Sequence, residues 1–399
     1  MAAVPGWIWF IFIFVFGSCV GSFLNVVIYR LPRDKSLITP GSSCPACGRR
    51  IHFYDNIPIV SWLLLGAKCR HCKASISPRY FVVELLTALV FLGLFILYFH
   101  TDLRSGLKPF PGGGWLIYLA SIILLGAFIA VSAIDLEYWV IPLSVCWLVT
   151  AVGFVASAVG PYIIHPSLIW AYSLLPRASA DAGALAAGAA IGLAISWVLV
   201  VTGVIKRSYE SENAEDWNRM VKKQEQAEAG SPCPESQPPQ PKLNHRLESC
   251  REIIFLLPIL FCSIAAVCIV SRVIPLETRN SFPMQHPVIA GLLGSLWGYF
   301  TGCGVVWAVR ILGTLAFGKE AMGMGDVHLM GAAGAVVGPL FVVVAFFIAP
   351  FFGLAWAGFQ MFFKKIRQIP YGPFLSLGVF VVMILHDWIR DRISFMFYR

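Results

Sequence analysis

Charged residues are scarce in this sequence. Its 399 residues include 30 Lys and Arg and 21 Asp and Glu, so 13% are charged, whereas an ordinary soluble domain carries about 25%. Hydrophobic residues make up 58%, and the mean hydropathy is +0.75. This composition excludes an ordinary soluble enzyme, a disordered chain and a small disulfide-rich module. The remaining class is an all-α polytopic membrane protein.

Several catalytic motifs are also absent. The sequence contains no HExxH metalloprotease motif, no GxSxG nucleophile elbow and no GxxxxGK[ST] phosphate-binding loop. Each motif places a metal ligand, a nucleophile or a phosphate-binding backbone in a defined local structure. A metalloprotease of that type, a serine hydrolase with that elbow and a P-loop ATPase therefore lose their main support.

The hydrophobic residues form long runs. A bilayer core about 30 Å thick requires roughly 20 apolar residues in a helix, and ten runs approach this length: 7–29, 79–99, 115–134, 140–158, 183–205, 253–274, 288–310, 327–345, 346–363 and 373–391. We therefore predict about 8–10 transmembrane helices, and ten crossings would put both termini on one side. The least defined boundary lies within 327–363, where Gly338-Pro339 and Pro350 are candidate breaks.

The basic residues are concentrated between the first two runs. Residues 30–79 contain nine Lys and Arg against two Asp, which predicts a cytoplasmic loop. No Lys or Arg precedes the first run, so it is expected to be a retained anchor with its N-terminus outside. By alternation, the loops 206–252, 311–326 and 364–372 are also cytoplasmic. The net charge of +9 therefore reflects membrane topology, and we expect no nucleic-acid partner.

Four of the eleven cysteines form two CxxC pairs, Cys44-Pro-Ala-Cys47 and Cys69-Arg-His-Cys72. Two such pairs can bring four thiolates onto one tetrahedral Zn²⁺. Disulfides or a thioredoxin-like redox pair are the alternatives, but a cytoplasmic loop is reducing and neither pair has a βαβ context. We expect the zinc to be structural, because four cysteines leave no open coordination position.

The other cysteines show no such pattern. Five lie in apolar runs and are expected to be packed core thiols: Cys19, Cys146, Cys262, Cys268 and Cys303. Cys233 and Cys250 lie in the hydrophilic loop and are given no role.

Two of the nine aspartates lie where an apolar helix is expected to meet the cytoplasmic face. Asp135 follows the third run in AIDLEYWVIP, and Asp326 lies in EAMGMGDVHLM after the seventh. Ionisable groups near the bilayer are costly and usually functional. Two close carboxyl groups share a proton, so they can activate water and protonate a leaving amine. Gly323 and Gly325 would give the loop backbone freedom and let a substrate strand approach.

Structural roles are the alternatives for both aspartates. Asp135 could be a charge at a helix end, and Asp326 could be the N-cap of the following helix. The sequence pattern alone does not choose between these roles and catalysis.

The order of these motifs resembles that of the type IV prepilin peptidases, the leader peptidase and N-methyltransferase family of type IV pilus and type II secretion systems. The resemblance is carried by GSCVGSFLNVVIYRLP (17–32), the cysteine segment 44–91, AIDLEYWVIP (133–142), EAMGMGDVHLMGAAGAVVG (320–338) and IPYGPFLSLG (369–378). Family members usually have eight spans and a shorter gap between their catalytic aspartates. Residues 159–286, with two extra spans and the polar loop 206–252, are therefore expected to be an insertion.

The resemblance implies a specific organisation and activity. It divides the chain into a first span (1–29), a cytoplasmic zinc-binding domain (30–78), a first part of the membrane core (79–158), the insertion (159–286) and a second part of the core (287–399). It implies that Asp135 and Asp326 form the catalytic dyad and that Cys44, Cys47, Cys69 and Cys72 bind zinc. The implied substrate is a prepilin or pseudopilin, cut on the cytoplasmic side of the bacterial inner membrane.

Methylation of the new N-terminus with S-adenosylmethionine is implied by the resemblance alone. The chain also departs from the usual family pattern at two places. It has Leu143 where an Asp commonly follows Ile-Pro, and His328 where a Lys commonly follows GDV. We expect His328 to be a helix-surface residue and Glu137 to be an interfacial charge.

Two other functions are compatible with a carboxylate pair. A transporter or membrane scaffold could use the aspartates as an ion relay, but this predicts acids deep within the spans rather than at their ends. An inactive peptidase homologue, whose insertion recruits secretion partners, would keep the fold without cleavage.

Overall fold

The computed structural model describes residues 6–44, 46–101, 103–107, 110–206, 208, 245–363 and 370–397. Within these ranges the chain is helical and contains no strand beyond two isolated bridges. Eight helices are long and apolar enough to cross a membrane, and a ninth span is present if the bent pair α14–α15 is counted as one. The prediction of an all-α polytopic membrane protein is confirmed.

The eight long helices are α1 (Gly6–Arg30), α3 (Pro78–Phe99), α4 (Gly114–Tyr138), α5 (Leu143–Ile163), α7 (Ala180–Val201), α9 (His245–Val273), α11 (Pro287–Phe317) and α13 (Pro339–Phe363). The shorter ones are α2 (Val60–Leu64), α6 (Pro166–Tyr172), α10 (Leu276–Gln285), α12 (Met324–Val337), α14 (Gly372–Ile384) and α15 (His386–Phe397). Most of the predicted loop 206–252, and residues 364–369 of the predicted loop 364–372, lie outside the described residues.

The predicted boundary at residues 345 and 346 was wrong. Helix α12 ends at Val337, and Gly338, with φ +93°, separates it from Pro339 at the start of α13. Glycine tolerates this backbone conformation, and proline favours the first turn of a new helix. Pro350 lies inside α13. With 14 residues, α12 is about 21 Å long, which is shorter than a full crossing.

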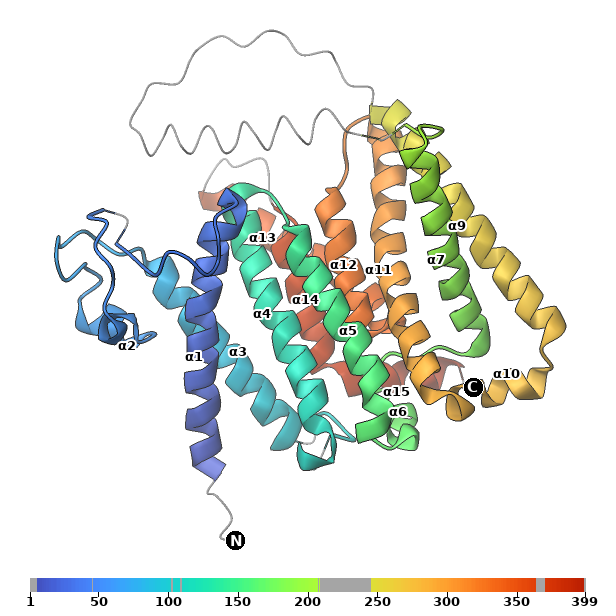
Figure 1. The fold of residues 1–399 in the computed structure, drawn as a ribbon, viewed down its shortest axis with the longest axis horizontal. Coiled ribbons are helices and arrows are strands. Elements are labelled where there is room, and N and C mark those ends of the chain that lie inside the picture. The colour runs from blue at the N-terminus through green and yellow to red at the C-terminus, as the bar shows by residue number, and fades with distance from the viewer. Residues whose placement is uncertain are drawn as a thin grey trace.

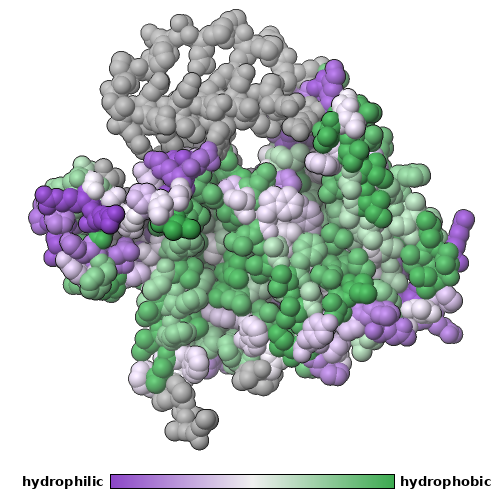
Figure 2. All heavy atoms as spheres, viewed as in Figure 1, coloured by the Kyte–Doolittle hydropathy of each residue, from purple (hydrophilic) through white to green (hydrophobic). Residues whose placement is uncertain are grey.

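The helices form a bundle with its loops at two ends (Figure 1). Helix α4 ends and α12 begins at the upper end of this view, whereas α1 begins and α15 lies at the lower end. Residues 31–77 form a lobe beside the upper half of α1. Figure 2 shows a wide apolar surface over the bundle and a hydrophilic surface on that lobe. This distribution is what a lipid-facing bundle with a water-facing lobe requires.

Lipid-facing surfaces explain a wrong expectation about the cysteines. Cys146 and Cys303 are buried, but Cys19 and Cys268 are exposed and Cys262 is partly exposed. Lipid is as apolar as a protein core, so hydrophobicity does not reveal which side of a membrane helix faces inward. Cys250 is exposed at the start of α9, and Cys233 lies outside the described residues.

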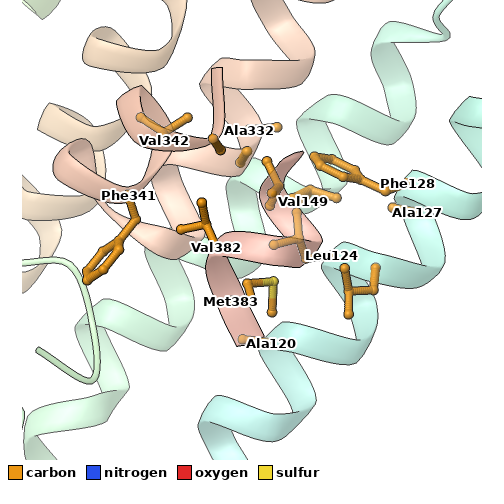
Figure 3. Close-up of a cluster of buried hydrophobic side chains, with 14 of the residues drawn as sticks. Ala120, Leu124, Ala127, Phe128, Val149, Ala332, Phe341, Val342, Val382 and Met383 are labelled. Carbon is orange, nitrogen blue, oxygen red and sulfur yellow. The ribbon is translucent and has the colours of Figure 1, made fainter. Parts of the chain in front are cut away.

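A core of apolar side chains joins α4 and α5 to the C-terminal helices. Figure 3 shows Leu124 and Phe128 of α4 beside Val149 of α5, with Val382 of α14 nearby. Helix α12 enters the same core through Ala332, which is fully buried. This core fixes α4, α12 and α14 relative to one another.

Small residues bring α11 and α12 together. A Cβ atom added to Gly298 would lie 2.0 Å from the Gly334 carbonyl oxygen, and one added to Gly302 would lie 2.2 Å from the Met330 carbonyl oxygen. Close helix approach of this kind replaces the hydrophobic driving force that lipid does not supply. The short helix α12 is thereby held along α11.

Candidate active site

Asp135 lies in the last turn of α4 and is 6% exposed. The hydrophobic run predicts that Asp135 follows the span, but the helix continues to Tyr138. Its Oδ2 accepts a hydrogen bond from the Gly372 backbone N–H at 3.0 Å. Gly372 starts α14, so the first turn of a distant helix holds this carboxyl group. A charge whose only role was to end the helix would remain exposed to water, whereas Asp135 is buried.

Asp326 is the third residue of α12 and is 7% exposed. The N-cap of this helix is Gly323, so the alternative that Asp326 itself is the N-cap was wrong. The carboxyl group reaches back over the helix start, since a Cβ atom on Gly323 would lie 3.5 Å from its Oδ2. An acidic side chain in the first turn is favourable there, because free N–H groups point toward it.

Ile141 lies against a glycine beside each of the two aspartates. A Cβ atom added to Gly325 would lie 2.7 Å from the Ile141 Cβ, and one added to Gly372 would lie 2.7 Å from Asp135 Oδ2 and 3.4 Å from the Ile141 Cδ1. Gly325 therefore leaves room for Ile141 beside Asp326, and Gly372 leaves room for the Asp135 carboxyl group.

This arrangement suits acid–base chemistry. Two buried carboxyl groups that influence each other favour a state with one proton between them, so one group is a base while the other is an acid. Of the supporting glycines predicted from sequence, Gly325 fills a place where a side chain does not fit, and Gly323 caps the helix. The roles of Gly372 and Ile141 were not predicted from the sequence. Gly372 lies in the motif IPYGPFLSLG and Ile141 in the motif AIDLEYWVIP, and these motifs were the signal that could have identified the two residues.

His328 was expected on a helix surface, but it is packed between helices. Its Nδ1 lies 3.3 Å from the Tyr299 hydroxyl of α11, and its ring centroid lies 6.0 Å from that of Trp147 of α5. Glu137 was expected to be an interfacial charge, and it pairs with Arg79 at the start of α3. The Arg79–Glu137 ion pair therefore joins the end of α4 to the start of α3, where the chain leaves the lobe.

The four predicted zinc ligands come together in the lobe. The Sγ atoms of Cys44, Cys47, Cys69 and Cys72 all lie within 4.8 Å of one another, and they are the one group in the described part of the chain that could hold a metal ion. The Cys44 and Cys72 sulfurs are 3.8 Å apart. Tetrahedral zinc with Zn–S bonds of about 2.3 Å requires sulfurs about 3.8 Å apart, so the residues fit zinc.

The two CxxC pairs have the same local structure. The fourth residue after the first cysteine of each pair has a positive φ, +67° at Gly48 and +60° at Lys73. Its N–H donates to the carbonyl of that cysteine, Gly48 to Cys44 at 2.8 Å and Lys73 to Cys69 at 3.0 Å. Hydrogen bonds from the backbone N–H groups of Cys72 and His71 lower the pKa of the Cys69 thiol to about 6. At Cys69 a thiolate, the form that binds metals, is therefore favoured at neutral pH.

Polar contacts attach the lobe to the membrane helices. The Ile59 N–H of the lobe donates to Glu84 Oε2 of α3 at 2.7 Å. Arg33, at the entrance to the lobe, donates to the Tyr138 hydroxyl in the last turn of α4. The lobe is therefore joined to the helix that carries Asp135.

Comparison with known proteins matches both ends of the chain. Residues 15–98 match the Bacterial Peptidase A24 N-terminal domain, and residues 255–358 match the Type IV leader peptidase family. The second match includes Asp326 and begins within the predicted insertion 159–286, whose boundaries remain a prediction. Asp135 lies between the two matched segments. No solved structure matches the chain.

Several curated relatives are named prepilin leader peptidase/N-methyltransferase, including proteins from Myxococcus xanthus, Aeromonas hydrophila and Dickeya chrysanthemi. The chain is 42% identical to the Myxococcus xanthus protein over 36% of this chain and 39% of that protein. It is 32% identical to the Aeromonas hydrophila protein over 42% of this chain and 67% of that protein. It is 31% identical to the Dickeya chrysanthemi protein over 48% of this chain and 76% of that protein. The aligned part thus covers well under half of the Myxococcus relative. From these matches and the ordered motifs, this chain belongs to the prepilin leader peptidase/N-methyltransferase family.

Proposed function

We propose that this protein is a membrane aspartic endopeptidase that removes the leader of type IV prepilins or pseudopilins and then methylates the new N-terminus. The observation that carries the peptidase proposal is the burial of Asp135 and Asp326 at the same end of the bundle. Membership of the family supports the choice of substrate. Methylation rests on the family alone, and no residue is assigned to S-adenosylmethionine.

In the proposed reaction, water lies between the two carboxyl groups. The ionised carboxylate takes a proton from the water, and the resulting hydroxyl oxygen attacks the scissile carbonyl carbon. The protonated carboxyl then gives its proton to the leaving amine as the C–N bond breaks. The Gly372 N–H holds Asp135 in place during both transfers. Both buried acids lie in helix turns at the bundle's end, a position that lets the substrate's apolar helix stay in lipid.

The proposed site is on the cytoplasmic side of the bacterial inner membrane, with the N-terminus outside. The basic residues of segment 30–79 support this orientation through the positive-inside rule. We propose that Cys44, Cys47, Cys69 and Cys72 hold a structural zinc ion, which would organise a lobe that has little apolar core of its own. The end-of-bundle position of the aspartates favours hydrolysis over the ion-relay alternative, which requires acids along a path through the bilayer.

Reconstitution with a synthetic prepilin tests the two activities separately. The purified protein in lipid vesicles is mixed with the prepilin and S-adenosylmethionine, and mass spectrometry follows loss of the leader and gain of one methyl group. Both mass changes are expected. Loss of the leader without methyl gain would refute the methyltransferase proposal alone, and an intact prepilin would refute the peptidase proposal and favour an inactive homologue.

Replacement of Gly372 by alanine is expected to lower kcat for leader removal by about 100-fold, the order of loss that a displacement of about 1 Å causes in a catalytic group. The added Cβ would lie 2.7 Å from Asp135 Oδ2, so the carboxyl group or α14 must move. Gly93→Ala is the matched control, since open space surrounds that position. Normal kcat in Gly372→Ala would show that this contact does not position Asp135.

A further inference from the structure

A buried arginine holds the loop that leads to Asp326. Residues 318–323 connect α11 to α12. Arg310 of α11, 3% exposed, donates from Nη1 to the Met322 carbonyl and, at 2.5 Å, to Glu320 Oε1. Because Met322 is only four residues before Asp326, the orientation of the guanidinium fixes where α12 begins.

The orientation of Arg310 depends in turn on Glu252 of α9. Glu252 is 2% exposed, and its Oε1 accepts from Arg310 Nε at 3.1 Å while its Oε2 accepts from Trp307 Nε1 at 2.8 Å. A buried guanidinium is stable only when its donors are matched with acceptors. By occupying Nε, Glu252 leaves Nη1 directed at the loop.

Helix α9 is a firm support for this contact because it packs closely on α7. A Cβ atom added to Gly188 or Gly192 of α7 would lie 2.4 Å from a backbone oxygen of α9. Ser196 of α7, fully buried, donates to the Phe255 carbonyl of α9 at 2.7 Å. Glu252 is thus one end of a rigid connection from the α7–α9 hairpin to the loop 318–323.

We infer that Glu252 is a positioning residue for the peptidase reaction, and that the α7–α9 hairpin uses it to set the position of Asp326 through Arg310. This inference rests on the proposed function. Without an ionised acceptor at Nε, the guanidinium turns toward Glu320 and draws Met322 with it. Asp326 then no longer meets Asp135 in the geometry that proton transfer requires. Glu252 itself touches no reacting atom.

Leader removal by three variants of the full-length protein tests the inference. Glu252→Gln keeps the shape of the side chain but removes its charge, and Arg310→Lys keeps the charge but loses the forked donors. Each is expected to lower kcat by about 10-fold to 100-fold and to leave KM within about 2-fold, because substrate contacts are unchanged. The double variant should lose no more than the worse single variant, since both act through one contact. The inference would be overturned if the kcat losses of the two single variants multiplied in the double variant, or if Glu252→Gln had a normal kcat.

Hydrogen exchange of the loop separates this inference from the proposed function. The Ala321 N–H donates to Thr314 Oγ1 at 3.2 Å, and Glu252→Gln should speed exchange in residues 318–323 by about 10-fold or more. Thr202→Ala removes an exposed hydroxyl that bonds only within α7, so it should change neither this exchange nor kcat. Unchanged exchange in Glu252→Gln, or equal effects in Thr202→Ala, would refute the positioning role. If Glu252→Gln speeds exchange in residues 318–323 but the wild-type protein leaves prepilin intact, the loop contact is supported and the proposed function is refuted.

Discussion

Asp135→Asn and Asp326→Asn are each expected to abolish leader removal, with a fall in kcat of at least about 1,000-fold. The amide has nearly the shape of the carboxylic acid but can neither take up nor release the catalytic proton at neutral pH. Each variant should therefore accumulate in the membrane as the wild type does. Mass spectrometry of a synthetic prepilin measures cleavage, and quantitative detection of the membrane fraction measures accumulation.

Asp181→Asn is a suitable control for these variants. Asp181 lies in the first turn of α7, half exposed, and pairs with Arg279 at 2.8 Å. An exposed ion pair contributes only about 0–1 kcal/mol to stability, so its loss should leave cleavage unchanged. If Asp135→Asn or Asp326→Asn processed prepilin at the wild-type rate, that aspartate would have no part in the mechanism.

The double replacement Cys44→Ser and Cys47→Ser is expected to release the proposed zinc and unfold the lobe of residues 31–77. Structural zinc contributes about 10–16 kcal/mol in small zinc-binding domains, far more than the polar contacts that attach this lobe to the bundle. Metal analysis of the purified protein should show about one zinc per wild-type chain and none in the variant. Limited proteolysis should cut the variant within the lobe.

The loss of the lobe should affect the activities unequally. The aspartates lie in the bundle, so we expect leader removal to fall by only about 10-fold, through loosening of the Arg33–Tyr138 contact beside Asp135. We expect the double cysteine variant to lose stability or methylation before it loses cleavage by Asp135 and Asp326. Cys19→Ser, at an exposed position on α1, serves as the control. Wild-type protein that contains no zinc would contradict the four-thiolate site.

Local sequence features predicted most of the fold. The lengths of the hydrophobic runs placed the spans, because a helix must cross a bilayer of fixed thickness. They failed at α12, whose apolar residues continue directly into α13, so the break depends on Gly338 and Pro339 rather than on hydropathy. Hydrophobicity also failed to predict that Cys19 and Cys268 are exposed, since the lipid-facing and core-facing sides of a membrane helix are equally hydrophobic.

The candidate site was predictable only in part. Asp135 and Asp326 were singled out by the rarity of acids near the bilayer and by the resemblance of their motifs to a known family. Gly372 was missed as a partner of Asp135 because the two lie 237 positions apart. Glu252 and Arg310 were missed because a single charged residue near an apolar run looks the same whether it faces water or a buried partner.

The sequence by itself determined the class of protein, the approximate spans, the zinc-type cysteine spacing and the residue types available for catalysis, because these depend on composition and on neighbours along the chain. Only the tertiary structure decided which polar groups meet. Close packing of α4, α12 and α14 brings two buried carboxyl groups to one end of the bundle, and α9 brings Glu252 to Arg310. Such contacts depend on side-chain packing between distant segments, which no local pattern records.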